Sequence, residues 1–316
     1  MPTLEFLRNF SNITKKDVLL AGGKGASLGE MANAGIHVPL GYVILAPAFD
    51  RFIKEACIKE EIDAALHKVN HEDIASVDEA SERIKAMIIS HEMPRDLATG
   101  ILAHFKKLGS KYVAVRSSAT AEDSSSAAWA GQLETYLNTT EKTLLENVKK
   151  CWASLFTPRA IFYRFEKNLH TSFISVAVVV QKMVESEIAG IAFSVHPVTK
   201  DRNQLIIEAG YGLGEAVVSG EITPDSYIVE KKDWMLLDVH IAEQEKALYR
   251  KASGGNEWKE LPASHKEKQK LTGKEIIELA KLIVKIEKHY SFPVDVEWAM
   301  KKGKFYITQS RPITTL

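Results

Sequence analysis

Alternating apolar residues mark the last part of the chain as a β-hairpin. Apolar side chains occupy every second position over residues 294–298 and 305–307, on either side of a Lys-Lys-Gly turn. A period of two is typical of strands that bury one face. The polar residues at the alternate positions are therefore expected on the opposite face, directed toward one point: Asp295, Glu297 and Gln309.

Helical periodicity dominates the first half of the chain and strand patterns dominate the second. Residues 49–108 predict three amphipathic helices, the third starting at Pro94. The nearly continuous β-branched stretch 175–184 predicts a strand buried on both faces. Further helices are expected near 141–155, 158–168 and 272–290, further strands near 111–116, 188–194, 204–208, 227–230 and 234–241, and an irregular charged connection over 243–270.

This order of elements predicts an α+β fold with two subdomains. The first, residues 1–170, is expected to be an α+β lobe with a glycine-lysine turn and a serine-rich lid loop. The second, residues 171–316, is expected to be strand-rich and to contain the hairpin. A cleft between two lobes is the usual place for a ligand.

Charge and cysteine content exclude several classes of function. Lysine plus arginine and aspartate plus glutamate both number 41, so the formal net charge is zero and no global field favours nucleic acid or an anionic membrane. Cys57 and Cys151 are isolated, which fits a reducing compartment and excludes a disulfide scaffold. With no signal-peptide pattern and no long apolar stretch, a cytoplasmic protein is expected.

Three cations and an oxygen-rich set suggest phosphate chemistry. The turn Gly22-Gly23-Lys24-Gly25 precedes a helix, but it lacks the spacing of a Walker A loop or a dinucleotide fingerprint. Lys24, Arg116 and Arg311 supply positive charge, and the loop after Arg116 is rich in serine and glycine. Fixed cations, accessible amides and Mg²⁺ held by oxygen ligands are the components of phosphoryl transfer. For the hairpin alone, a solvated edge is the alternative reading.

Six segments make the chain resemble a known family. It is similar to the N-terminal nucleotide-binding region of the phosphoenolpyruvate synthase and pyruvate phosphate dikinase family, which also includes rifampicin phosphotransferases. The likeness runs through essentially the whole chain and is closer to the phosphoenolpyruvate synthase branch. The matching segments are GGKGASLGEM at 22–31, VRSSATAED at 115–123, AGQLETYLN at 130–138, GLGEAVVSG at 212–220, DVEW at 295–298 and QSRPI at 309–313.

The resemblance implies an ATP-grasp-like fold whose two subdomains hold ATP, with phosphoryl transfer to a histidine and release of AMP and phosphate. By position, Lys24, Arg116 and Arg311 would hold the phosphates, and Glu297 with Gln309 would hold Mg²⁺, supported by Asp295. The lid would contribute Gly131 and Thr135. The adenine would lie beside Gln181, Met183 and Val184; on pattern alone, Met183 and Val184 could equally be core residues.

Two departures from the family leave alternatives open. The lid reads Ser-Ser-Ser-Ala-Ala-Trp over 124–129, without the family's proline and acid. No histidine has the family's phosphohistidine context, so we expect that domain in trans or in a longer parent chain, with pyruvate involved only indirectly. The alternatives are a non-catalytic or regulatory ATP-binding module, and the ATP domain of a rifampicin-type antibiotic phosphotransferase.

Overall fold

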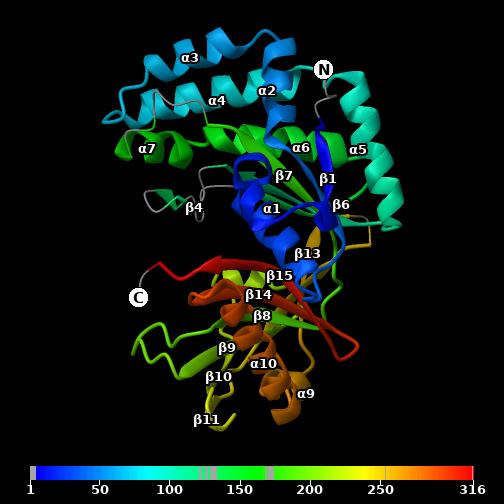
Figure 1. Cartoon of the computed structure of the whole chain (residues 1–316), viewed down its shortest axis with the longest axis vertical. Coiled ribbons are helices and arrows are strands. Elements are labelled where there is room, and N and C mark those ends of the chain that lie inside the picture. Colours follow the sequence, from blue (N-terminus) through cyan, green and yellow to red (C-terminus); the bar gives the residue numbers. More distant parts are fainter. Residues whose placement is uncertain are drawn as a thin grey trace. The chain divides into compact units, whose positions relative to one another are not determined.

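The chain divides into two compact units, each built on its own sheet (Figure 1). The structure is a computed structural model, and it describes residues 5–120, 123–124, 127–128, 134–167, 169, 174–252, 254–314 and 316. Unit 1 comprises residues 1–30 and 40–183, and unit 2 comprises 31–39 and 184–316. The predicted α+β fold class is confirmed. The boundary lies at Met183 rather than after residue 170, because the strand at 176–182 pairs within the sheet of unit 1.

Unit 1 contains a five-stranded sheet with a strand order that does not follow the chain. Its strands, in spatial order, are β1 (Leu7–Asn9), β2 (Gly41–Ile44), β7 (Val176–Lys182), β3 (Val113–Ala119) and β6 (Thr135–Thr139). All the pairings are antiparallel. A separate short ladder joins β4 (Asp123–Ser124) to β5 (Ala127–Ala128). The predicted strand at 111–116 continues to Ala119, so the first residues of the expected serine-rich loop are strand.

Helices on one side of this sheet form the main core of unit 1. They are α2 (Ala46–Glu55), α3 (Lys59–His67), α4 (Ile74–Ser90), α5 (Arg95–Leu108), α6 (Leu144–Ala153) and α7 (Pro158–Glu166). Of these, α2, α5 and α6 contact the strands directly. Trp152 is fully buried and its ring stacks on Phe52 with centroids 5.0 Å apart. The expectation of three helices in 49–108 was wrong: there are four, because the chain turns at Ala56–Ile58 and again before Asp73, which caps α4.

The other face of the sheet carries α1 (Val18–Asn33), whose glycine stretch packs against the strands. A Cβ on Gly25 would lie 3.1 Å from the side chain of Val43 on β2. Single-turn 3-10 helices precede α1 and follow α6, at Phe10–Asn12, Lys15–Asp17 and Ser154–Phe156. The unit boundary falls inside α1, after Glu30.

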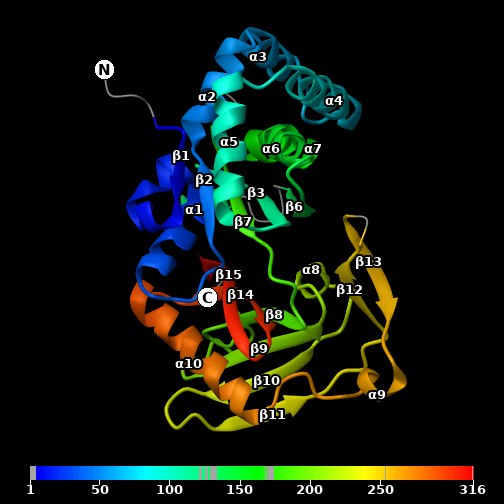
Figure 2. The ribbon, with the colours of Figure 1, turned by 90° about the vertical axis from the view of Figure 1, so that its right-hand side faces the viewer.

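Unit 2 contains a six-stranded antiparallel sheet covered on one face by α10 (Gly273–Tyr290) (Figure 2). Its strands, in spatial order, are β11 (Leu236–His240), β10 (Asp225–Glu230), β9 (Gln204–Tyr211), β8 (Ile188–Phe193), β14 (Val294–Lys301) and β15 (Lys304–Pro312). The start of α10 is fixed by a capping box between Thr272 and Glu275. Its buried residues, among them Ile276, Leu279 and Ile283, pack on the sheet.

The charged segment 243–270 was predicted to be irregular, yet it contains a hairpin and a short helix. The hairpin pairs β12 (Lys246–Arg250) with β13 (Asn256–Glu260), and α9 (Ala263–Lys266) follows it. Its base rests on Gly212, which has a φ of 90° and where a Cβ would lie only 2.5 Å from Leu248 O. The short α8 (Glu215–Val218) comes next along the chain from this glycine. Composition suggested a loop because the segment is dense in lysine and glutamate and contains the sequence Ser-Gly-Gly-Asn at 253–256.

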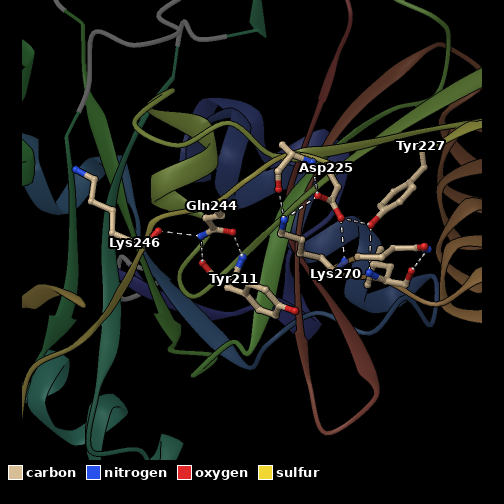
Figure 3. A network of polar contacts seen from close by, with 9 residues as sticks. Tyr211, Asp225, Tyr227, Gln244, Lys246 and Lys270 are labelled. Atoms are coloured by element: carbon tan, nitrogen blue, oxygen red, sulfur yellow. Dashed lines mark hydrogen bonds and ion pairs between the residues drawn. The ribbon is translucent and has the colours of Figure 1, made fainter. Parts of the chain in front are cut away.

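A buried polar network connects β9 and β10 of the unit 2 sheet to residues 242–246 and to Lys270 (Figure 3). Lys270 and Asp225 have fully buried side chains and form an ion pair of 2.8 Å. The hydroxyl of Tyr227 donates to the same carboxylate, and the Lys270 ammonium also donates to Ala242 O. Gln244 bonds both backbone groups of Tyr211 and the carbonyl of Lys246, which joins β9 to the start of β12. Among the described residues, no helix is long and apolar enough to cross a membrane.

Candidate functional site

The glycine-lysine turn of unit 1 is held in place by Ser118 of β3. Gly22 has φ 68° and ψ 172°, a conformation open essentially only to glycine, and it breaks α1 into two helical parts. The Ser118 hydroxyl donates to Ala21 O at 3.0 Å and accepts from Gly25 N at 3.3 Å. The second part of α1 therefore begins beside Lys24, where the first amides of a helix favour an anion.

Arg116 stands on the same face of β3 as Ser118, two positions earlier. Directly opposite Arg116 lies Thr135 on β6, and on the other side lies Val179 of β7. Opposed residues of neighbouring strands project to the same face. Three predicted phosphate-binding or lid residues of unit 1 are thus brought together: Lys24, Arg116 and Thr135. We call the sheet face that carries Arg116, Ser118, Thr135 and Gln181 the site face of unit 1.

Gln181 is a buried amide on this face, at the end of β7. It is opposite Ala114 on β3 and Gly41 on β2, and its side chain is only 3% exposed. Its Nε2 has no hydrogen-bond partner in the part of the chain that the structure describes. Buried amide nitrogens normally donate a hydrogen bond, so an acceptor on a ligand would complete this one.

The two residues expected to continue the adenine slot lie at the unit boundary. Met183 is the last residue of unit 1 and donates its backbone N–H to Tyr112 O, while Val184 is the first residue of unit 2. Both are half-buried rather than core residues. Gly131, expected in the lid, lies outside the described residues.

In unit 2, the terminal hairpin has the predicted two faces. Asp295 is directly opposite Arg311, and Glu297 is directly opposite Gln309. A bulge after Glu297 shifts the register, so that Trp298 faces Ile307 and both stay in the core. Without this bulge, the polar and apolar residues of one strand would change faces.

Asp295 holds the guanidinium of Arg311. Both Nε and Nη2 of Arg311 lie 2.7 Å from the same Asp295 oxygen. Burial raises the pKa of Asp295, and the charge of Arg311 opposes that rise. Glu297 and Gln309 add carboxylate and amide oxygens on the same face of the strand pair, a hard donor set that suits Mg²⁺. Within the described residues, no three Asp, Glu, His or Cys side chains converge to hold a metal ion by themselves.

Strand pairing adds Glu208, which sequence reasoning missed. Glu208 of β9 is opposite Ile191 of β8, and Ile191 is opposite Glu297. Burial raises the pKa of Glu208, and the nearby charge of Asp295 raises it further. The sequence identified Glu208 only as a strand residue; its neighbours across the sheet depend on pairing between segments far apart in the chain. We call the face that carries Glu208, Asp295, Glu297, Gln309 and Arg311 the acidic face of unit 2.

Comparison with known proteins relates nearly the whole chain to one family. The family described as "Pyruvate phosphate dikinase, AMP/ATP-binding domain" matches residues 18–316. A "Probable phosphoenolpyruvate synthase" of Methanocaldococcus jannaschii is 46% identical over 321 residues, covering 99% of this chain and 27% of that protein. The "Phosphoenolpyruvate synthase" of Pyrococcus furiosus is 42% identical over 358 residues, covering 98% of this chain and 44% of its own.

A further relative has a different named activity. The "Rifampicin phosphotransferase" of Bacillus cereus is 38% identical over 314 residues, covering 98% of this chain and 36% of its own. The chain thus spans less than half the length of these curated relatives. Among solved structures, a D-alanine–D-alanine ligase from Bacillus anthracis aligns over 76% of this chain and 57% of its own at 13% identity with a TM-score of 0.28, and a likeness at that score carries no argument.

Proposed function

Because the chain belongs to the family of pyruvate phosphate dikinase AMP/ATP-binding domains, we propose that it binds ATP with Mg²⁺ and serves as the nucleotide half of a phosphoenolpyruvate synthase. In this proposal, a phosphoryl group passes to a histidine on a domain outside this chain, with release of AMP and phosphate. The fold would be ATP-grasp-like. The two relatives named as phosphoenolpyruvate synthases support this choice of reaction.

The observation that carries the proposal is the composition of the site face of unit 1. It places a cation, the start of a helix and a buried amide donor without a partner among the described residues on one side of a sheet. Lys24, the amides after it and Arg116 would bind phosphate oxygens, since fixed donors stabilise the charge of a transferring phosphoryl group. Gln181 would donate to the base, with Met183 and Val184 beside it.

The acidic face of unit 2 would bind the cation, and its Arg311 would add one more positive charge. Glu297 and Gln309 would bind Mg²⁺, which neutralises phosphate charge when bound. Asp295 would orient Arg311 toward the phosphates rather than act chiefly as a metal ligand, because its oxygen already accepts from that guanidinium. Arg and phosphate pair well because the planar guanidinium matches two oxygens.

A product assay tests this reaction. The protein is incubated with ATP and Mg²⁺, with and without a histidine-bearing domain of a phosphoenolpyruvate synthase, and AMP is resolved from ADP. AMP formed only when that domain is present is the expected result. Tight ATP binding without AMP in either case would contradict the reaction and favour a non-catalytic ATP-binding module.

The rifampicin phosphotransferase of Bacillus cereus motivates a second candidate, the ATP domain of an antibiotic phosphotransferase. Its identity to this chain is lower than that of the Methanocaldococcus jannaschii protein, 38% against 46%. The same assay with the remaining domains of a rifampicin phosphotransferase and rifampicin distinguishes the two. Phosphorylated rifampicin, without AMP formation by the synthase domain, would favour this candidate.

A further inference from the structure

Glu208 belongs to the row of the unit 2 sheet that contains the expected cation ligands. The row runs Ser226, Glu208, Ile191, Glu297, Gln309 across β10, β9, β8, β14 and β15. Only β8 separates Glu208 from Glu297, so their Cα atoms are about 9.5 Å apart, two strand spacings. Both side chains project to the face opposite α10, because the alternate residues, such as Ile207 and Val296, are fully buried on the α10 side.

The carboxylate of Glu208 is half-buried and has neither a hydrogen bond nor an ion pair with any residue that the structure describes. Its neighbour Asp295 carries the same charge and is already bonded to Arg311. A partly desolvated charge beside a like charge is unfavourable unless a cation compensates it.

A fully buried acid of the same sheet, Asp225, shows how such a charge is normally compensated. Asp225, on the face toward α10, accepts from the ammonium and backbone amide of Lys270, from the hydroxyl of Tyr227 and from Ala242 N (Figure 3). Glu208 has no comparable set of donors among the described residues. The contrast leaves room for a cation from solution beside Glu208.

The neighbouring row of the acidic face, which contains Gly210 and Ala189, is covered by α8. Small residues there make room for α8: a Cβ on Gly214 would lie 3.4 Å from Ala189, and a Cβ on Gly210 would lie 3.0 Å from Val217. Glu208 is in the next row, beyond this contact. The α8 contact at Gly210 and Ala189 therefore stops one row short of Glu208.

We propose that Glu208 is a positioning residue for the divalent cation, and that its carboxylate accepts hydrogen bonds from water molecules bound to a cation held by Glu297 and Gln309. This inference rests on the proposed function. We assign the contact to bound water rather than to the metal itself, because β8 lies between Glu208 and Glu297. Mg²⁺ keeps several waters when it binds to proteins, and residues that bond those ligands tune its affinity.

The test measures cation binding rather than activity. Mn²⁺ is titrated by electron paramagnetic resonance in the presence of a non-hydrolysable ATP analogue, for the wild-type protein and Glu208→Gln. Loss of an outer-shell partner lowers metal affinity about 10-fold or more, and we expect this for Glu208→Gln. The matched control, Glu230→Gln, removes a carboxylate near the end of β10, where it accepts from Asn203, and should leave the affinity unchanged.

Thermal unfolding without cation separates this role from a structural one. Removing an uncompensated charge should leave the midpoint of Glu208→Gln unchanged or raise it, whereas a structural acid would lower it. Unchanged Mn²⁺ affinity, or a lowered midpoint with unchanged affinity, would overturn the inference while nucleotide binding by the wild type still supports the proposed function. Failure of the wild type to bind nucleotide contradicts the proposed function, and this inference with it.

Discussion

The site face of unit 1 and the acidic face of unit 2 fix their polar residues by different means. In unit 1, close packing does so: Gly22 lies against the backbone of Ser118, whose hydroxyl ties two points of α1 to β3. In unit 2, strand register does so, since each polar residue of β14 is opposite one of β15. A turn of unusual conformation thus positions the donors of unit 1, and a bulged hairpin positions the carboxylate and amide oxygens of unit 2.

The two faces also differ in the charge they offer to a ligand. Unit 1 presents Lys24, Arg116 and the Gln181 amide, which suit phosphate and base. Unit 2 presents Glu208 in one row with Glu297 and Gln309, which suits a cation. Its fully buried charges, Asp225 and Lys270, are paired on the covered side of the sheet. Burial of a charge therefore does not by itself mark a ligand surface, since the fully buried Asp225–Lys270 pair is satisfied within the protein.

The largest effect is expected on the covered side of unit 2. Lys270→Ala leaves the Asp225 charge buried without its cation, which costs about 3–5 kcal/mol of unfolding free energy. Arg51→Ala is the control in unit 1: it removes ion pairs to Asp96 and Glu55, whose side chains are 67% and 49% exposed, and solvent screening should make its loss much smaller. Urea unfolding measures both. Equal losses for the two variants would show that burial does not distinguish these pairs.

Arg311→Ala tests the acidic face itself. Removing one fixed charge from a phosphoryl-transfer site lowers the rate about 100- to 1,000-fold, or roughly 2.7–4 kcal/mol. The fold should remain, because the Arg311 side chain is 45% exposed. AMP formation with the added histidine domain is the measurement, and Arg51→Ala should retain the wild-type rate. A folded Arg311→Ala protein with unchanged AMP formation would exclude Arg311 from the site.

Gly22→Ala tests the packing of the site face of unit 1. Its backbone conformation costs a residue with a side chain roughly 1–3 kcal/mol, and we expect the upper end because the new Cβ would lie 2.3 Å from Ser118 O. Displacing the turn should also weaken ATP binding. Gly109→Ala is the control: φ is again positive, 58°, but nothing lies within 4 Å. A Gly22→Ala protein that loses stability but binds ATP normally would separate the turn from the ligand.

The hairpin was the most predictable part of the site. Alternation in residues 294–298 assigned Asp295 and Glu297 to one face, and the register confirms that assignment. The bulge after Glu297 was not predictable, because it depends on how Trp298 and Ile307 fit the core. The hairpin in 246–260 was missed for a related reason: charged residues give no apolar period, and its base depends on contact with Gly212.

Local sequence determined the residues that need only their neighbours in the chain. It specified the strands at 176–182 and 294–301, the cap of α10 and the glycine-lysine turn, since periodicity, capping and glycine content act over a few residues. Tertiary structure alone decided that β7 belongs to unit 1, that Gln181 is buried without a partner among the described residues and that Glu208 shares a row with Glu297. These facts arise from pairing between distant segments, which no local pattern encodes.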